Sequence, residues 1–145
     1  MTDPARSATF DTNVLVSGFL SPSGPPARIV EWLAAGVLRA VVDARIADEY
    51  ETVLKRPELK LPPSDVRPVL GRILQVALWI TVPPDGAVAG LPDADDAPFA
   101  ECALAARTLL VKDNKRHFPR SVVGDLLVVS PRTFVERARA GGSSQ

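Results

Sequence analysis

The sequence is poor in the residues that build disulfide scaffolds and histidine-rich metal sites. Its 145 residues include one cysteine, Cys102, and one histidine, His117. A single cysteine excludes an intramolecular disulfide and a zinc site made of several thiolates. A single histidine likewise excludes a metal site made mainly of imidazoles. Cys102 shares an apolar helix face with Phe99, Ala103 and Ala106, so we expect it to pack in the core.

The chain also lacks long apolar runs and an excess of charge of one sign. No apolar run approaches the roughly 18 residues of a membrane-spanning helix. The N-terminus lacks the basic-then-apolar pattern of a signal peptide. We therefore expect a soluble, cytoplasmic protein with no membrane partner. Lys and Arg together number 17, as do Asp and Glu, so net charge gives no indication of a nucleic-acid partner.

Length and apolar content indicate one domain. A hydrophobic content of 46% in 145 residues is enough for a full core. We expect this domain over residues 1–140 and a flexible tail over residues 141–145.

Predicted strands and helices alternate along the chain. The expected strands are 8–10, 38–42, 78–82, 108–111 and 126–129. The expected helices are 12–20, 27–35, 45–56, 64–77, 95–107 and 131–140, the fourth becoming regular only from Pro68. Such alternation favours an α/β fold whose parallel sheet is covered by helices on both faces. Sites in these sheets form at the carboxyl ends of the strands.

Charge is distributed unevenly. Between Ile80 and Ala106 there are five acids and no Lys or Arg, whereas from Lys112 onward seven basic residues outnumber three acids. An acidic pocket beside a basic rim fits a metal site next to an anionic substrate. Chance clustering on a balanced surface is the alternative.

Two acids stand at positions with a second explanation. Asp11 follows the first strand, where it serves as a metal ligand or as the N-cap of the next helix, two roles that different oxygens can fill together. Glu49 belongs to a helix in which Arg45, one turn earlier, would form an ordinary i,i+4 pair with it.

The acids at 93, 95 and 96 are harder to explain by helix capping alone. One capping acid would suffice, and two unit charges ~5 Å apart repel by about 3 kcal/mol at an effective dielectric of ~20. A divalent cation would offset this repulsion. Asp113 and Asn114, which follow the fourth strand after Lys112, are a further candidate pair.

Four segments resemble PIN-domain proteins in order and spacing. They are FDTNVLVSG (10–18), EYETVLKRP (49–57), PDADDAPF (92–99) and NKRHFP (114–119). The resemblance covers about residues 9–134 and is nearest to the toxins of bacterial toxin–antitoxin pairs, relatives of VapC-type toxins. It implies a three-layer α/β/α sandwich with about five parallel strands, and a ribonuclease that depends on Mg²⁺ or Mn²⁺.

The resemblance also implies which residues form the site. Asp11, Glu49 and Asp96 match the three acidic positions of the family, and Asn114 matches the fourth, so these four are the expected catalytic and metal-binding residues. The polar residues Asn13 and Ser17 are expected to hold the first carboxylate. Products would end in 5′-phosphate and 3′-hydroxyl groups.

One departure from the family pattern affects the fourth position. A hydroxyl residue and a small residue usually precede it, but this chain has Lys112 and Asp113. Two interpretations stay open: Asp113 is itself a metal ligand, or Lys112 neutralises Asp113 by an ion pair. The departure also keeps open a catalytically degenerate PIN scaffold that binds RNA or a protein partner without cleavage.

Partners and rival folds complete the expectations. Three basic residues just past the site are candidates to hold an RNA backbone, although a solvated loop would look the same: Lys115, Arg116 and Arg120. By resemblance we expect a cognate antitoxin protein and leave a homodimer open. A phosphoacceptor receiver domain is disfavoured, because it would need an acidic pair near the first strand and a lone Asp midway. This chain has them in the opposite order.

Overall fold

The sheet is parallel throughout and has five strands. The computed structural model describes residues 6–113 and 124–143. The strands are β1 (Ser7–Phe10), β2 (Arg39–Val42), β3 (Leu78–Trp79), β4 (Leu110–Val111) and β5 (Val128–Val129), in the spatial order β3-β2-β1-β4-β5. Every neighbouring pair is parallel. The expected parallel sheet is therefore confirmed.

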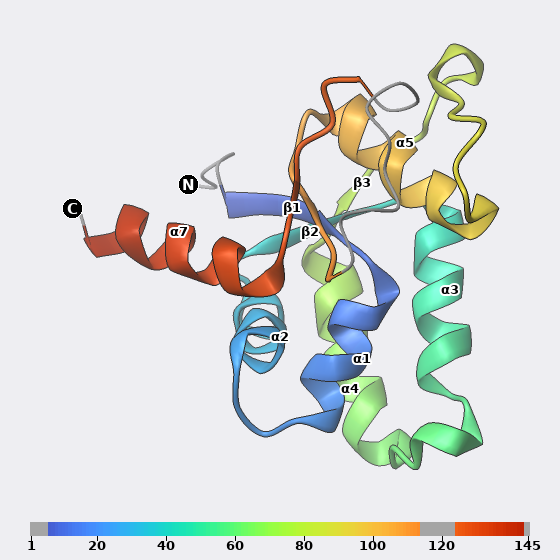
Figure 1. Ribbon diagram of the computed structural model, residues 1–145. Coiled ribbons are helices and arrows are strands. Elements are labelled where there is room, and N and C mark those ends of the chain that lie inside the picture. Colours follow the sequence, from blue (N-terminus) through green and yellow to red (C-terminus); the bar gives the residue numbers. More distant parts are fainter. Residues whose placement is uncertain (1–5, 114–123, 144–145) are drawn as a thin grey trace.

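Helices cover both faces of this sheet (Figure 1). Their bounds are α1 (Thr12–Leu20), α2 (Pro25–Ala35), α3 (Ala44–Leu54), α4 (Pro63–Val76), α5 (Ala97–Ala106) and α7 (Pro131–Ser143). Helix α5 lies on one side of the strands, and α1, α2 and α4 lie on the other, with α7 beside α2. The predicted three-layer α/β/α sandwich is thus confirmed. In the part of the chain that is described, no helix combines the length and the apolar character needed to cross a bilayer.

The register brings the carboxyl ends of the central strands together. Phe10 at the end of β1 is paired with Val111 at the end of β4. The next residue, Asp11, donates its backbone N–H to the carbonyl of Val111 at 3.0 Å. Lys112 in turn donates its backbone N–H to Val129 of β5 at 2.9 Å. The residues that follow β1 and β4 therefore lie side by side at one edge of the sheet.

Helix α4 differs from its predicted form. It begins at Pro63 and contains Pro68 in its interior, whereas the sequence predicts regular helix only from Pro68. Pro63 suits the first helical position, because its φ is preset and its missing N–H is not needed there. Pro68 lies on the exposed face, where water can bond the carbonyl that loses a partner. Burial of Val66, Leu70 and Ile73 holds the opposite face on the core.

β3, β4 and β5 are each at least two residues shorter than predicted, and helices α2 and α7 are longer by two and three residues. β3 ends at Trp79, whereas the sequence predicts a strand to Val82. Pro83 and Pro84 supply no backbone donor for a longer ladder, and a 3-10 turn, η3 (Pro84–Gly86), follows. Ile80 and Val82 still pack against the core. The ladders of β4 and β5 each include two residues instead of four. Helix α7 continues to Ser143, past the predicted end at residue 140.

Candidate functional site

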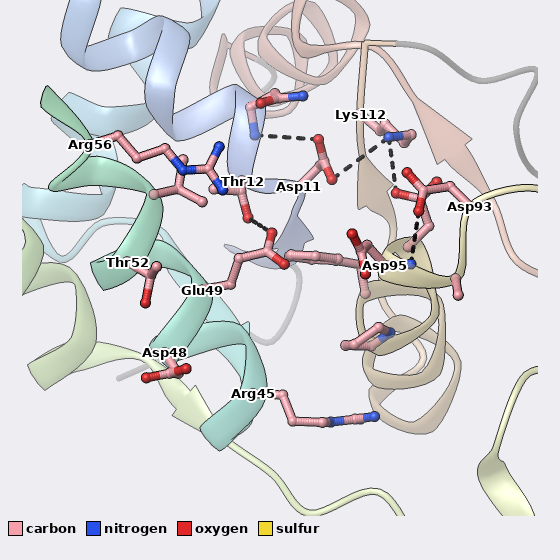
Figure 2. Close-up of a pocket in the computed structure, with 16 residues that line it drawn as sticks. Asp11, Thr12, Arg45, Asp48, Glu49, Thr52, Arg56, Asp93, Asp95 and Lys112 are labelled. Atoms are coloured by element: carbon pink, nitrogen blue, oxygen red, sulfur yellow. Dashed lines mark hydrogen bonds and ion pairs between the residues drawn. The ribbon is translucent and has the colours of Figure 1, made fainter. Parts of the chain in front are cut away.

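A polar pocket of about 840 Å³ opens at the carboxyl edge of the sheet. Its walls come from segments far apart in the chain: the end of β1, helix α3, the 3-10 turn η4 (Ala94–Asp96) and the residue after β4. Figure 2 shows acidic side chains from these segments pointing toward one another across the pocket. The lining includes Asp11, Asn13, Glu49, Asp96 and Lys112.

Asp11 caps α1 with one carboxylate oxygen and turns the other toward the pocket. Its side chain is buried, with 6% of the residue exposed. One oxygen, Oδ2, accepts the backbone N–H of Asn13 at 3.3 Å and caps α1. The other, Oδ1, lies 3.7 Å from Nζ of Lys112 and faces the pocket. Burial raises the pKa of Asp11, against the opposing effects of Lys112 and the Asn13 N–H, and Asp96 raises it further.

Asp96 combines an ion pair with an unsatisfied oxygen. It is also 6% exposed, and its Oδ1 accepts a hydrogen bond from Nζ of Lys112 at 3.3 Å. Its Oδ2 is buried and has no hydrogen-bond partner among the described residues. The neighbouring acids Asp93 and Asp95 are exposed. Asp93 caps η4 by accepting the backbone N–H of Asp95 at 2.9 Å. A buried, unbonded carboxylate oxygen is costly, so this atom is a donor available to a bound cation.

Glu49 reaches the pocket because α3 is tied to β1. The next residue, Tyr50, is fully buried and donates its hydroxyl to the carbonyl of Phe10 at 2.6 Å. This contact fixes Glu49 beside the residues that follow β1. Thr12 of α1 donates its hydroxyl to the Glu49 carboxylate. The pKa of Glu49 is raised by burial and by the charges of Asp11 and other acids, while the Thr12 hydrogen bond lowers it.

Lys112 stands between two carboxylates of the pocket. The residue is 7% exposed, and its ammonium approaches both Asp96 and Asp11. Of the two interpretations left open for Lys112 and Asp113, the structure supports neither as stated. Among the described residues, Lys112 forms ion pairs with Asp11 and Asp96, and Asp113 is exposed and does not line the pocket.

Arg45 organises a separate ion-pair cluster at the rim of the pocket. The expected pair with Glu49 is replaced by contacts to Asp43 at 2.7 Å and to Glu101 of α5 at 2.8 Å. Glu101 also accepts the backbone N–H of Val88 at 2.8 Å, so the cluster connects α3, α5 and the segment that leads to η4. This cluster stabilises the wall that carries Asp96.

Metal binding can be tested against the donor atoms. In the described segments, no group of three acidic, His or Cys side chains is drawn together as a metal cage. The available donors are nevertheless carboxylate oxygens, which hard divalent cations prefer. Asp96 Oδ2 supplies an unsatisfied buried oxygen at the same place. The donor set therefore fits Mg²⁺ or Mn²⁺, with Lys112 between two of the donors.

Comparison with known proteins identifies the family. The family model of the PIN domain matches residues 7–115. The chain belongs to the PIN-domain family. PIN domains are generally nucleases, so the pocket lies in a nuclease fold. The predicted family resemblance is thereby confirmed.

One solved structure illustrates the shared PIN fold. It is the crystal structure of VapBC2 from Rickettsia felis bound to a DNA fragment from its promoter, with a TM-score of 0.55 and 15% identity. The match covers 86% of this chain and 98% of that chain. At this identity the likeness concerns the fold. No curated protein matches the chain in sequence.

Within this PIN domain, the expected site residues have different placements. Asp11, Glu49 and Asp96 line one pocket, as does Asn13, whose backbone rather than side chain contacts Asp11. Ser17 lies further along α1 and is half-buried. Five residues named from the sequence lie outside the described residues: Asn114, Lys115, Arg116, His117 and Arg120.

Sequence reasoning missed several residues that line this pocket, among them the polar residues Thr12, Thr52 and Arg56. Thr12 sits inside the Asp-Thr-Asn motif but carries no signal that its hydroxyl faces α3. Arg56 also lines the pocket, at the end of the EYETVLKRP segment, and Figure 2 shows its guanidinium near Thr12. The position of Arg56 in the motif was visible in the sequence, whereas its place in the pocket lining depends on how α3 packs.

Proposed function

We propose that this PIN-domain protein is a metal-dependent endoribonuclease. The observation that carries the proposal is the meeting of Asp11, Glu49 and Asp96, from three distant segments, in one polar pocket. Buried carboxylates are unfavourable without compensation. Their gathering at the carboxyl edge of a parallel sheet is typical of a functional site.

The roles of the acids follow from their surroundings. Asp11 and Asp96 would hold Mg²⁺ or Mn²⁺, the latter through its unsatisfied Oδ2. When bound, the cation supplies Lewis-acid chemistry, lowering the pKa of water and stabilising charge on the phosphate. Glu49, held by Thr12, orients the attacking water and accepts its proton. Its raised pKa makes it a stronger base than an exposed glutamate.

Substrate binding needs cations near these acids. Arg56 also lines the pocket, and its guanidinium is suited to bind a phosphate of the RNA backbone. The basic residues Lys115, Arg116 and Arg120 follow the site in sequence and would extend this contact along RNA. These basic side chains would then bind RNA phosphates on either side of the acidic pocket.

A toxin role and an antitoxin partner are part of the proposal. The similar fold occurs in a VapBC2 complex, and the four sequence segments resemble VapC-type toxins. We infer that this protein is inhibited by a cognate antitoxin, and a homodimer remains compatible with the proposal.

A specific observation favours a second candidate, a PIN scaffold that binds RNA or protein without cleavage. Lys112 lies between Asp11 and Asp96, where a catalytic cation would be shared. If Lys112 never leaves, the acids cannot assemble a metal site, and only binding would persist.

Cleavage of a panel of single-stranded and structured RNAs, in Mn²⁺ or in EDTA, separates the two candidates. We expect wild type to cut in Mn²⁺ and Asp96→Asn to lose cutting. Asp65→Asn, which removes an exposed carboxylate on α4, is the matched control and should cut like wild type. RNA binding without turnover under every condition would favour the scaffold and reject the nuclease.

A further inference from the structure

Lys112 is placed where the acidic site would share a cation. Its backbone is fixed at the end of β4 by the hydrogen bond to Val129. From there the side chain extends into the pocket, and Nζ lies 3.3 Å from Asp96 Oδ1 and 3.7 Å from Asp11 Oδ1 (Figure 2). The side chains of all three residues are each 9% exposed. Lysine is rarely so buried unless carboxylates compensate its charge.

The ammonium compensates the acids only in part. One positive charge faces the two carboxylates of Asp11 and Asp96, and the Glu49 carboxylate lies in the same pocket. Lys112 binds Oδ1 of Asp96, whereas Oδ2 remains buried without a hydrogen-bond partner among the described residues. The site therefore retains negative charge and an available oxygen, which a divalent cation would use and a single ammonium does not.

We propose that Lys112 is an internal counter-ion that competes with a divalent cation for Asp11 and Asp96. Either the ammonium or the metal ion occupies the space between the two carboxylates, so metal binding requires the Lys112 side chain to withdraw. This inference rests on the proposed function in one respect, since it assigns the metal to Asp11 and Asp96. Its consequence is a metal affinity below that of the same acids without Lys112.

The first test is calorimetric titration of Mn²⁺ into wild type and Lys112→Met. Methionine keeps much of the length and apolar stem of lysine but removes the charge. We expect the variant to bind Mn²⁺ about tenfold more tightly, because the substitution removes the ammonium that repels the cation and that competes with it for the two carboxylates. Lys55→Met, at the exposed C-cap of α3, is the matched control and should bind like wild type. Equal or weaker binding by Lys112→Met would overturn the proposal.

A second test uses wild type alone, so it does not depend on the folding of a variant. Acetic anhydride acetylates accessible lysines, and mass spectrometry reports each site. We expect acetylation of Lys112 to be slow without metal and to rise several-fold in saturating Mg²⁺, with Lys55 as the internal reference. If Mg²⁺ binds and Lys112 remains protected, the two cations do not compete.

These readouts distinguish failure of this inference from failure of the proposed nuclease activity. Tighter Mn²⁺ binding by Lys112→Met with no RNA cleavage by either protein would support the competition and reject the nuclease. Cleavage by wild type, with unchanged Mn²⁺ affinity in Lys112→Met, would support the nuclease and reject the competition. Absence of Mn²⁺ binding by both proteins would reject the competition.

Discussion

Asp11 and Lys112 directly follow neighbouring strands, and their side chains face each other with 3.7 Å between Oδ1 and Nζ. The pairing of Phe10 with Val111 makes this meeting a consequence of sheet register. A one-residue change of register would turn one of the two side chains to the opposite face. The charge balance of the pocket is therefore set by the same hydrogen bonds that build the sheet.

Divalent cations should stabilise the folded protein. The acids of the pocket are partly buried and repel one another, and a bound cation would reduce both costs. At ten times the dissociation constant, Mn²⁺ would add about 1.4 kcal/mol to the free energy of unfolding, seen as a rise in melting temperature. Asp96→Asn should lose most of this rise, whereas Asp65→Asn should keep it. An identical response of Asp96→Asn and wild type would argue against a shared metal site.

Thr12 is expected to act as a positioning residue for Glu49. It is buried, and its hydroxyl donates to the Glu49 carboxylate. Thr12→Val keeps the shape of the side chain and removes the donor, so Glu49 can rotate away from the water it orients. We expect kcat for RNA cleavage to fall by about 10- to 100-fold with little change in KM.

The conservative variant separates positioning from packing at this residue. Thr12→Ser retains the hydroxyl and loses a methyl group, so it should keep most of kcat although it lowers the melting temperature. If Thr12→Ser lost as much activity as Thr12→Val, the hydroxyl would not be the feature that matters.

The difference between local and tertiary information explains which parts of the site could be predicted. Strand ends and helix starts follow from local apolar patterns, so Asp11 could be assigned both a cap and a pocket role. The partners of Lys112 could not be predicted from local patterns. Asp96 is 16 residues away in the sequence, and its proximity to Lys112 depends on how α5 packs. The adjacent Asp113 was the natural sequence-based partner, but it lies in a bend past the end of β4 and is exposed.

Arg45 gives the same lesson on a helix. An i,i+4 pair between Arg45 and Glu49 is the usual expectation. The Arg45 guanidinium instead donates to Glu101, 56 residues away, and to Asp43, two residues before it. Asp43 is the extended N-cap residue of α3, a geometry that brings its carboxylate within reach of Arg45. Glu49 is then left for Thr12 and the pocket.

The Asp43 pair should make stability depend on pH in the acid range. Burial would raise the pKa of Asp43, but hydrogen bonds from Arg45 and the Ile46 N–H outweigh it and hold the pKa below the ordinary value of 3.8. The stabilisation is therefore complete above pH 3.8 and is lost as the pH falls through the lower, folded-state pKa. Because Arg45 is about half exposed, the ion pair with Asp43 should contribute only about 1 kcal/mol to the free energy of unfolding.

Asp43→Asn tests this dependence, since asparagine still caps α3 but carries no charge. Urea unfolding should show wild type more stable than the variant at neutral pH, and the difference should close only below pH 3.8. Asp65→Asn controls for loss of an exposed carboxylate. A difference that stayed constant into strong acid would mean that the charge of Asp43 contributes nothing.

The contact between α1 and α2 should tolerate no side chain at Gly18. A Cβ atom there would lie 2.4 Å from Val30 Cγ2 and 2.6 Å from the backbone oxygen of Pro26. The backbone oxygen cannot move without shifting α2, so Gly18→Ala should lower the free energy of unfolding by about 1–3 kcal/mol, measured by urea unfolding.

Gly71, on the exposed face of α4, is the matched control, because a Cβ atom added there would meet no neighbouring group within 4 Å. There alanine should raise stability by about 0.5–1 kcal/mol through its higher helix propensity. Opposite signs for the two glycine-to-alanine variants would identify close helix packing as the cause, because the chemical change is the same. If Gly18→Ala were as stable as Gly71→Ala, α1 and α2 would not approach so closely, and the α1 N-terminus that Asp11 caps would be less firmly held.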